Sequence, residues 1–174
     1  MSVHFAQAAL PRDRDALLAM NIAYIGWVAD GVAQRFKVSL PDLLDAPIPE
    51  YADAALEGLC AHTPPNGVFY VVRDGDAVAG MGGLRRIGAD RCEMKRVYVE
   101  PSHRGAGLGA QIARKLIADA QSFGYAHMAL DTGPFMTAAH RVYEALGFRD
   151  IAAYPEAELP PALHAGWRFM ARAL

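Results

Sequence analysis

The residues best suited to chemistry lie in a short run in which one arginine is followed by alternating glycines: Arg104, Gly105, Gly107 and Gly109. Residues 92–100 before the run are rich in Val and Tyr, as strands are, and residues 108–123 after it have the periodicity of an amphipathic helix. Backbone N–H groups in the first turn of a helix have no partner, and the helix dipole makes that end partly positive. Glycines let an anion approach those groups, and a guanidinium adds a fixed positive charge. The run predicts a phosphate or diphosphate site, with a turn that only packs on a sheet as the alternative.

The neighbouring segments predict the elements that hold this run in place. Residues 68–73 and 77–85 flank Asp74-Gly75, a dipeptide typical of the tight turn in a hairpin. Residues 92–100 form the next strand, antiparallel to the second strand of the hairpin. Residues 125–131 form another strand beyond the helix, and a right-handed crossover makes it parallel to 92–100.

Further elements are expected on either side, at 3–8 (strand), 53–61 (helix), 135–146 (helix) and 166–171 (strand). A helix also opens near Pro11, because a proline and acidic residues suit the first turn. Gly26 and Gly31 argue against a single unbroken helix after this start. One mixed α/β domain over residues 1–174 is the expected organisation.

Composition excludes several classes of protein. A formal net charge of −2 without a basic block argues against a nucleic-acid surface, and no run of about 18 apolar residues indicates a membrane span. The first residues lack the features of a signal peptide. Cys60 and Cys92 fit no zinc or redox spacing, and the six histidines are scattered, so no metal site is expected. These features predict a soluble cytoplasmic protein.

Two motifs together resemble a known family. The pattern Arg104-x-x-Gly107-x-Gly109 is similar to the pyrophosphate-loop motif of the GNAT superfamily of N-acetyltransferases, and Ala139-x-x-x-Tyr143-x-x-x-Gly147-Phe148 is similar to its second signature. They occur in the family's order and spacing across about a third of the chain. The resemblance implies the acyl-CoA N-acyltransferase fold: one α/β domain with a mixed sheet of six or seven strands, antiparallel N-terminal hairpins, a splayed parallel pair and flanking helices.

The resemblance also implies acetyl-CoA as co-substrate. Backbone groups of Val97 and Val99, with Tyr98 between them, would bind the pantetheine arm, and Ala139 would lie beside it. The diphosphate would be held by the turn: Arg104, Gly105, Ala106, Gly107, Leu108 and Gly109. Many members carry Asn or Gln where this chain has Met136, which offers only packing and a weak sulfur acceptor.

Transfer to an amine needs a proton donor for the departing thiolate and an acceptor for the amine proton. Tyr143 is the candidate acid, with a buried core tyrosine as the alternative. Glu93 is the candidate base, directly or through water, with a salt bridge to Lys95, Arg96 or Arg91 as the equal alternative. His140 and His164 are weaker candidates for the base.

Tyr24 and Trp27 lie three residues apart in the sequence and are candidates for an aromatic wall of the acceptor site, although such a pair is more often core. We expect direct attack by the primary amine of a small metabolite or amino-acid-like acceptor, with a peptide or protein amino terminus as the second choice. A non-catalytic acyl-CoA sensor or interaction domain is the main alternative to an enzyme. A dinucleotide-binding module is disfavoured because the glycine spacing is wrong. The sequence is also compatible with a homodimer.

Overall fold

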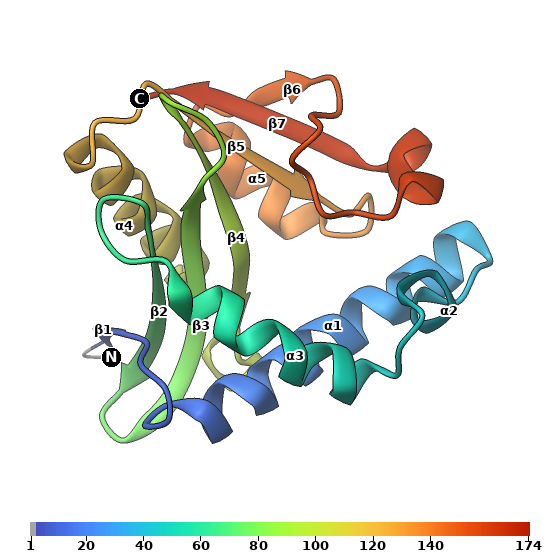
Figure 1. The fold of residues 1–174 in the computed structure, drawn as a ribbon, viewed down its shortest axis with the longest axis horizontal. Helices are drawn as coiled ribbons and strands as arrows, with labels where there is room; N and C mark the ends of the chain where they lie inside the picture. Colours follow the sequence, from blue (N-terminus) through green and yellow to red (C-terminus); the bar gives the residue numbers. More distant parts are fainter. Residues whose placement is uncertain (1–2) are drawn as a thin grey trace.

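In the computed structural model, which describes residues 3–174, one mixed sheet forms the centre of the molecule (Figure 1). Its strands are β1 (Val3–Gln7), β2 (Gly67–Asp74), β3 (Ala77–Arg86), β4 (Arg91–Val99), β5 (His127–Thr132), β6 (Arg149–Ile151) and β7 (Arg168–Ala173). The spatial order is β1-β2-β3-β4-β5-β7-β6. Only β4 and β5 are parallel; the remaining neighbours are antiparallel. The expected hairpin, crossover and mixed sheet are confirmed, whereas the short strand β6 was not expected.

Helices cover both faces of this sheet. They are α1 (Arg14–Phe36), α2 (Leu40–Leu44), α3 (Ile48–Ala61), α4 (Leu108–Ser122) and α5 (Thr137–Ala145). Alternate residues of β2 point to opposite faces, so Val68 and Val72 pack with α4, while Phe69 and Val71 pack with α1 and α3. The α4 side buries the largest apolar cluster, and the α1 side carries a second one.

Helix α1 runs unbroken through Gly26 and Gly31, contrary to the expectation from its glycines. The ring of Phe135 explains one of them: a Cβ at position 31 would lie 2.4 Å from the ring. Gly31 therefore permits close packing between α1 and the loop before α5. Helix α3 also begins at Ile48, five residues earlier than expected, with Pro49 in its first turn where proline is tolerated.

By length and apolar composition alone, α1 is the one helix within residues 3–174 that meets the minimum for a membrane span. This differs from the expectation that no segment of the chain suits a membrane span. In the fold, however, Leu17 and Met20 of α1 are buried against the sheet. Since core helices of folded domains meet the same minimum, the composition of α1 is weak evidence for a membrane.

Strands β4 and β5 separate after a short stretch of pairing. Their register runs only from Arg91 opposite His127 to Glu93 opposite Ala129, although both strands continue further. Beyond this point β4 also carries a bulge against β3, between Met81 and Gly83. The splayed parallel pair is thus present, and it leaves a gap in the middle of the sheet beyond Glu93 of β4 and Ala129 of β5.

Candidate active site

The glycine-rich run forms an exposed turn that leads into α4. Gly105 and Gly107 have φ of 83° and 78°, and Gly107 is the N-cap of α4. A Cβ on either glycine would meet no other described atom within 4 Å, so the space beside both is open. Leu108, in contrast, is buried and anchors the helix start in the core. The turn therefore presents bare N–H groups of a helix N-terminus to solvent, which suits a diphosphate.

Arg104 lies beside this turn with an exposed side chain. Its Nε donates a hydrogen bond to the carbonyl oxygen of Val99 (3.0 Å), and its guanidinium lies 5.5 Å from the ring centre of Tyr98 and 5.9 Å from that of Trp27. These contacts hold the arginine at the end of β4 with its side chain exposed beside the turn, where a guanidinium suits an anion.

The edge of β4 beyond Glu93 faces the gap between the strands. Tyr98 and Val99 still pair with β3, opposite Met81 and Gly80. Tyr98 is buried toward α1, and Val99 is half-buried. No described strand pairs with this part of β4 on its other side, so the edge is available to an extended ligand.

Tyr143 lies on the inner face of α5, where its ring packs edge-to-face on Phe148 (5.8 Å between ring centres). The side chain is buried, yet its hydroxyl forms no hydrogen bond within residues 3–174 and is not fully enclosed. Burial, reinforced by Tyr24 and Asp131, raises the pKa of this phenol well above its usual range. Ala139, one turn earlier, is half-buried.

Glu93 lies inside an ion-pair network. Only 1% of it is exposed, and both carboxylate oxygens have partners. Oε1 accepts from the Tyr154 hydroxyl (2.8 Å) and Oε2 from Nε of Arg85 (2.7 Å), with Nζ of Lys95 at 3.8 Å. The ion pair with Lys95 is one of the alternatives that the sequence left open; the stronger partner, Arg85, was not foreseen. Neither oxygen is free to meet an amine without a rearrangement.

Asp131 is a second carboxylate at this gap, near the end of β5. Nε1 of Trp167 donates to its Oδ1 (2.8 Å). Burial raises the pKa of Asp131 to about 6; the indole hydrogen bond lowers it, and the charge of Glu93 raises it. Unlike Glu93, this carboxylate lines a cavity.

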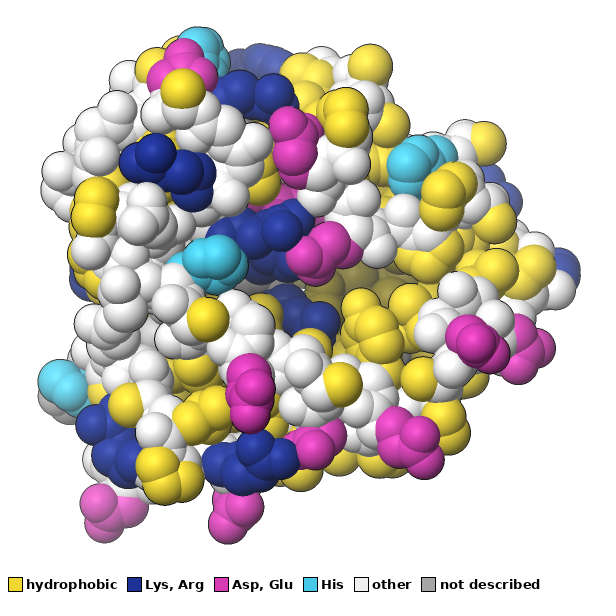
Figure 2. Space-filling model, viewed as in Figure 1, with side chains coloured by type: hydrophobic (Ala, Val, Ile, Leu, Met, Phe, Trp, Pro, Cys, Tyr) yellow, Lys and Arg dark blue, Asp and Glu magenta, His cyan; other side chains and the backbone are white. Residues whose placement is uncertain are grey.

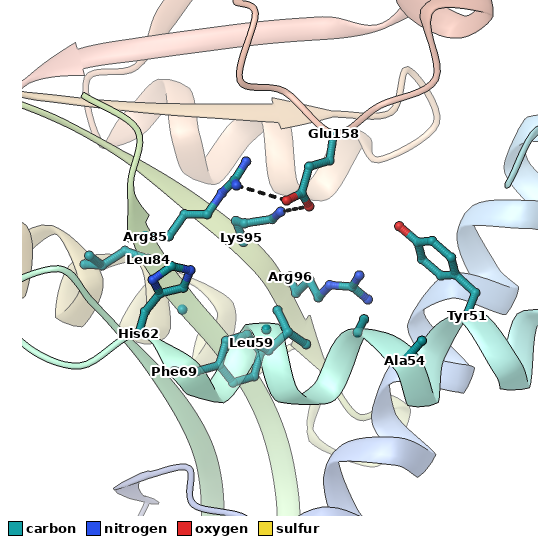
Figure 3. Close-up of a pocket in the computed structure, with 13 residues that line it drawn as sticks. Tyr51, Ala54, Leu59, His62, Phe69, Leu84, Arg85, Lys95, Arg96 and Glu158 are labelled. Atoms are coloured by element: carbon teal, nitrogen blue, oxygen red, sulfur yellow. Dashed lines mark hydrogen bonds and ion pairs between the residues drawn. The ribbon is translucent and has the colours of Figure 1, made fainter.

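Two adjoining cavities lie on the α1 and α3 side of the gap, with volumes of about 370 Å³ and about 120 Å³. Figure 2 shows this face, where Lys and Arg side chains gather in a central hollow beside apolar ones. The two cavities share four polar residues: Tyr51, Lys95, Arg96 and Glu158. In Figure 3, Arg85 and Lys95 both reach Glu158, whereas Arg96 extends separately toward Tyr51.

The two aromatic candidates lie in different surroundings. Tyr24 lines the smaller cavity, and burial raises the pKa of its phenol to about 12. Trp27 is 39% exposed and lines neither cavity; it packs edge-to-face on Phe135 and lies near Arg104. The pair is in contact, with 6.5 Å between ring centres, but only Tyr24 faces the cavity.

The remaining candidates are held by structural contacts. Nε2 of His140 lies 2.9 Å from the Gly133 carbonyl oxygen, and Nε2 of His164 lies 3.0 Å from that of Leu159. Met136 is buried, with the Thr132 hydroxyl 3.5 Å from its sulfur. Within the described chain, no group of three His, Cys, Asp or Glu side chains is placed to hold a metal ion.

Comparison with known proteins identifies the family. The sequence model of the acetyltransferase (GNAT) family matches residues 34–148. The chain belongs to the acetyltransferase (GNAT) family. It is 34% identical over 103 residues to an uncharacterized N-acetyltransferase of Schizosaccharomyces pombe, covering 58% of this chain and 63% of that protein. Human N-acetylaspartate synthetase is 33% identical over 98 residues, covering 56% of this chain and 32% of that protein. The chain therefore spans less than two thirds of these relatives.

Solved structures agree with the GNAT fold. The PaiA N-acetyltransferase of Thermoplasma acidophilum, solved in complex with coenzyme A, superimposes with a TM-score of 0.76 at 15% identity, over 100% of both chains. An acetyltransferase of Streptococcus agalactiae gives 0.70 at 20% identity, over 99% and 98%. At these identities the likeness concerns the fold alone.

In this GNAT domain, sequence reasoning missed two charged residues that line the smaller cavity, Asp131 and Arg96. Asp131 entered the prediction only as the last residue of the expected strand 125–131, and Arg96 only as a possible salt-bridge partner of Glu93. A signal for Asp131 did exist, because it closes the predicted parallel strand after the crossover, where ligands bind in parallel sheets. Arg96 gave no comparable signal, since its orientation depends on the bulge in β4.

Proposed function

We propose that this GNAT domain transfers an acetyl group from acetyl-CoA to the primary amine of a small, amino-acid-like acceptor, by direct attack in a ternary complex. One observation carries the proposal: an open glycine-rich turn and a charged cavity lie on two sides of the point where β4 and β5 separate. Two substrates held at these places can meet through the gap. The name of the human relative, N-acetylaspartate synthetase, denotes an acetylated amino acid, which supports this class of acceptor.

The residues present suit acetyl-CoA. The N–H groups from Arg104 to Gly109 would hold the diphosphate, and the Arg104 guanidinium would add a charge-assisted contact. The free edge of β4 at Val97 and Val99 would bind the amides of the pantetheine arm as a further strand would, with Tyr98 between them. Ala139 would leave space for the arm beside Tyr143. When bound, acetyl-CoA supplies the thioester carbonyl that the amine attacks.

The transfer forms a bond between the amine nitrogen and the acetyl carbon and breaks the bond between that carbon and the sulfur. One proton leaves the amine and one reaches the departing thiolate. Tyr143 is the proposed donor, because its phenol is protonated at neutral pH and its hydroxyl has no partner in the described chain. Asp131 is the proposed proton acceptor, because it lines the cavity and burial raises its pKa to about 6.

Glu93 as the base remains a competing proposal. Its carboxylate would accept a proton only if Tyr154 or Arg85 gave up its hydrogen bond. Breaking a buried ion pair costs on the order of several kcal/mol, so Glu93 is the weaker candidate for the base. In this scheme it positions the side chains of Arg85 and Tyr154.

The proposal is tested by incubating the protein with acetyl-CoA and a panel of amines, amino acids and peptides while following free thiol. Sustained thiol release above hydrolysis, with an acetylated amine identified by mass spectrometry, supports the function. Coenzyme A binding without transfer to any amine supports the sensor alternative. Preference for peptides over free amino acids supports the amino-terminal alternative. Absence of coenzyme A binding refutes the proposal.

We also propose a cytoplasmic location. Both cysteines are free, and burial raises the pKa of the Cys92 thiol to about 12, so it is inert. Cell fractionation with an antibody against the native protein tests this location.

A further inference from the structure

Arg96 differs from the other cations of the cavity in its partners. Arg85 is bonded to Glu93 and Glu158, and Lys95 is bonded to Glu158. Arg96 forms no ion pair with any carboxylate in residues 3–174, although it lines both cavities. It is therefore the one cavity cation in the described chain whose charge is not matched by a direct partner.

The side chain of Arg96 is nevertheless fixed in place. Its Nη1 donates to Oδ1 of Asn21 (2.7 Å), and Asn21 is fully buried and donates in turn to the Leu17 carbonyl oxygen (2.8 Å). Asn21 is neutral, so it orients the guanidinium without neutralising it. The other nitrogens of the planar guanidinium are left for a group that accepts two parallel hydrogen bonds.

The backbone at this position is also unusual. Arg96 has φ of 51°, a left-handed conformation that costs a residue with a side chain about 1–2 kcal/mol. It lies at the bulge where β4 slips against β3. Bulges re-aim side chains near active sites, and here the bulge directs an arginine into the cavity.

Resting on the proposed function, we propose that the acceptor is an amino acid whose carboxylate is bound by Arg96 while its amine lies at Asp131. Both residues line the smaller cavity, one from β4 and one from β5, so a zwitterion meets a complementary charge at each end. The adjoining larger cavity is lined by apolar groups such as Ala54, Leu59 and Phe69 beside the paired cations, and it would receive the amino-acid side chain.

The test compares L-amino acids with their α-carboxamides, which keep the size and remove the charge. The amine of the carboxamide is less basic, so more of it is neutral and able to attack at a given pH. On reactivity alone the carboxamide would be the better acceptor, so a preference for the acid has to come from binding of the carboxylate. For the wild-type protein we expect kcat/KM at least 10-fold higher for the acid. Arg96→Gln should abolish this preference, Arg96→Lys should retain part of it, and Arg141→Met, an exposed arginine of α5, should leave it unchanged.

A binding measurement separates this inference from the proposed function. Thermal unfolding is followed with coenzyme A and either the amino acid or its carboxamide, for wild type and Arg96→Gln; the melting curves also show whether the variant folds. The inference is supported if the amino acid stabilises the wild-type protein and does not stabilise Arg96→Gln. This holds even if no acetyl transfer occurs and the proposed function fails. Equal turnover or equal stabilisation by acid and carboxamide overturns it while leaving N-acetylation intact. No stabilisation by either compound, in a protein that acetylates neither, also overturns it.

Discussion

The two sides of β4 offer different kinds of groups to a ligand. On the side of α4, the turn from Arg104 to Gly109 presents mostly backbone N–H groups and open space. On the side of α1, the cavity presents side chains that come from α1, β4, β5 and the segment before β7. A site built from backbone N–H groups can bind the same ligand whatever the side chains are. A site built from side chains can bind a different ligand after a few substitutions. The two sides therefore suit a shared co-substrate and a specific acceptor.

The largest effect is expected where the two sides meet, at Tyr143. Tyr143→Phe should lower kcat by about 100-fold or more, because general acid catalysis typically contributes that much. Affinity for coenzyme A, measured by calorimetry, should stay unchanged. Tyr125→Phe is the matched control, since that phenol bonds the Pro65 carbonyl oxygen away from the gap. An unchanged kcat for Tyr143→Phe at all pH values excludes Tyr143 as the acid.

Asp131 and Glu93 are the two candidate bases, and the pH dependence of the reaction distinguishes them. Asp131 must be ionised to accept a proton, so kcat/KM should fall as the pH drops below about 6. Asp131→Asn should lower kcat/KM by about 100-fold and remove this acidic limb. Asp90→Asn, at an exposed carboxylate, serves as control. If Glu93→Gln removes the limb and Asp131→Asn retains it, the base is Glu93.

A smaller effect is expected in the turn itself. Gly107→Ala places a side chain at φ of 78°, which costs about 1–2 kcal/mol and disturbs the N–H groups at the helix start. The KM for acetyl-CoA should rise about 10-fold while the KM for the acceptor stays constant. Gly26→Ala, within α1 and with no described atom near its Cβ, should alter neither. A change confined to the acceptor KM would contradict the division between the two sides.

The smallest effect is expected at Glu158, which is half-exposed and bridges Arg85 and Lys95. Exposed ion pairs contribute up to about 1 kcal/mol, so Glu158→Gln should change acceptor KM by only about 3-fold. The change should favour acidic amino acids over neutral ones, because two cations lose their partner. Steady-state kinetics with aspartate and leucine measure the ratio, and an unchanged ratio shows that these cations do not contact the acceptor.

The part of the site that sequence reasoning predicted is the part encoded locally. The turn, α4 and the crossover to β5 depend on neighbouring residues, on helix periodicity and on the handedness of the connection. The hairpin at Asp74-Gly75 is local in the same sense. These features predicted the position of the glycine-rich turn and the parallel pair of strands correctly.

The rest depended on contacts between distant segments. Glu93 was recognised as charged, but its burial against Tyr154 follows from the path of the chain 61 residues later. The bulge that turns Arg96 into the cavity arises from pairing between β3 and β4, which periodicity does not show. The continuity of α1 through Gly31 likewise depended on Phe135, which lies about a hundred positions further on.

The ring of Phe135 also links helix α1 to Asp131. Phe135 lies against Gly31 on one side and meets the indole of Trp167 edge-to-face on the other, with 5.8 Å between ring centres. Trp167 in turn donates the hydrogen bond that Asp131 accepts. A methyl group added to α1 at position 31 would displace the ring of Phe135 and, through it, that of Trp167. A change at a residue that lines neither cavity would therefore alter the proton affinity of Asp131.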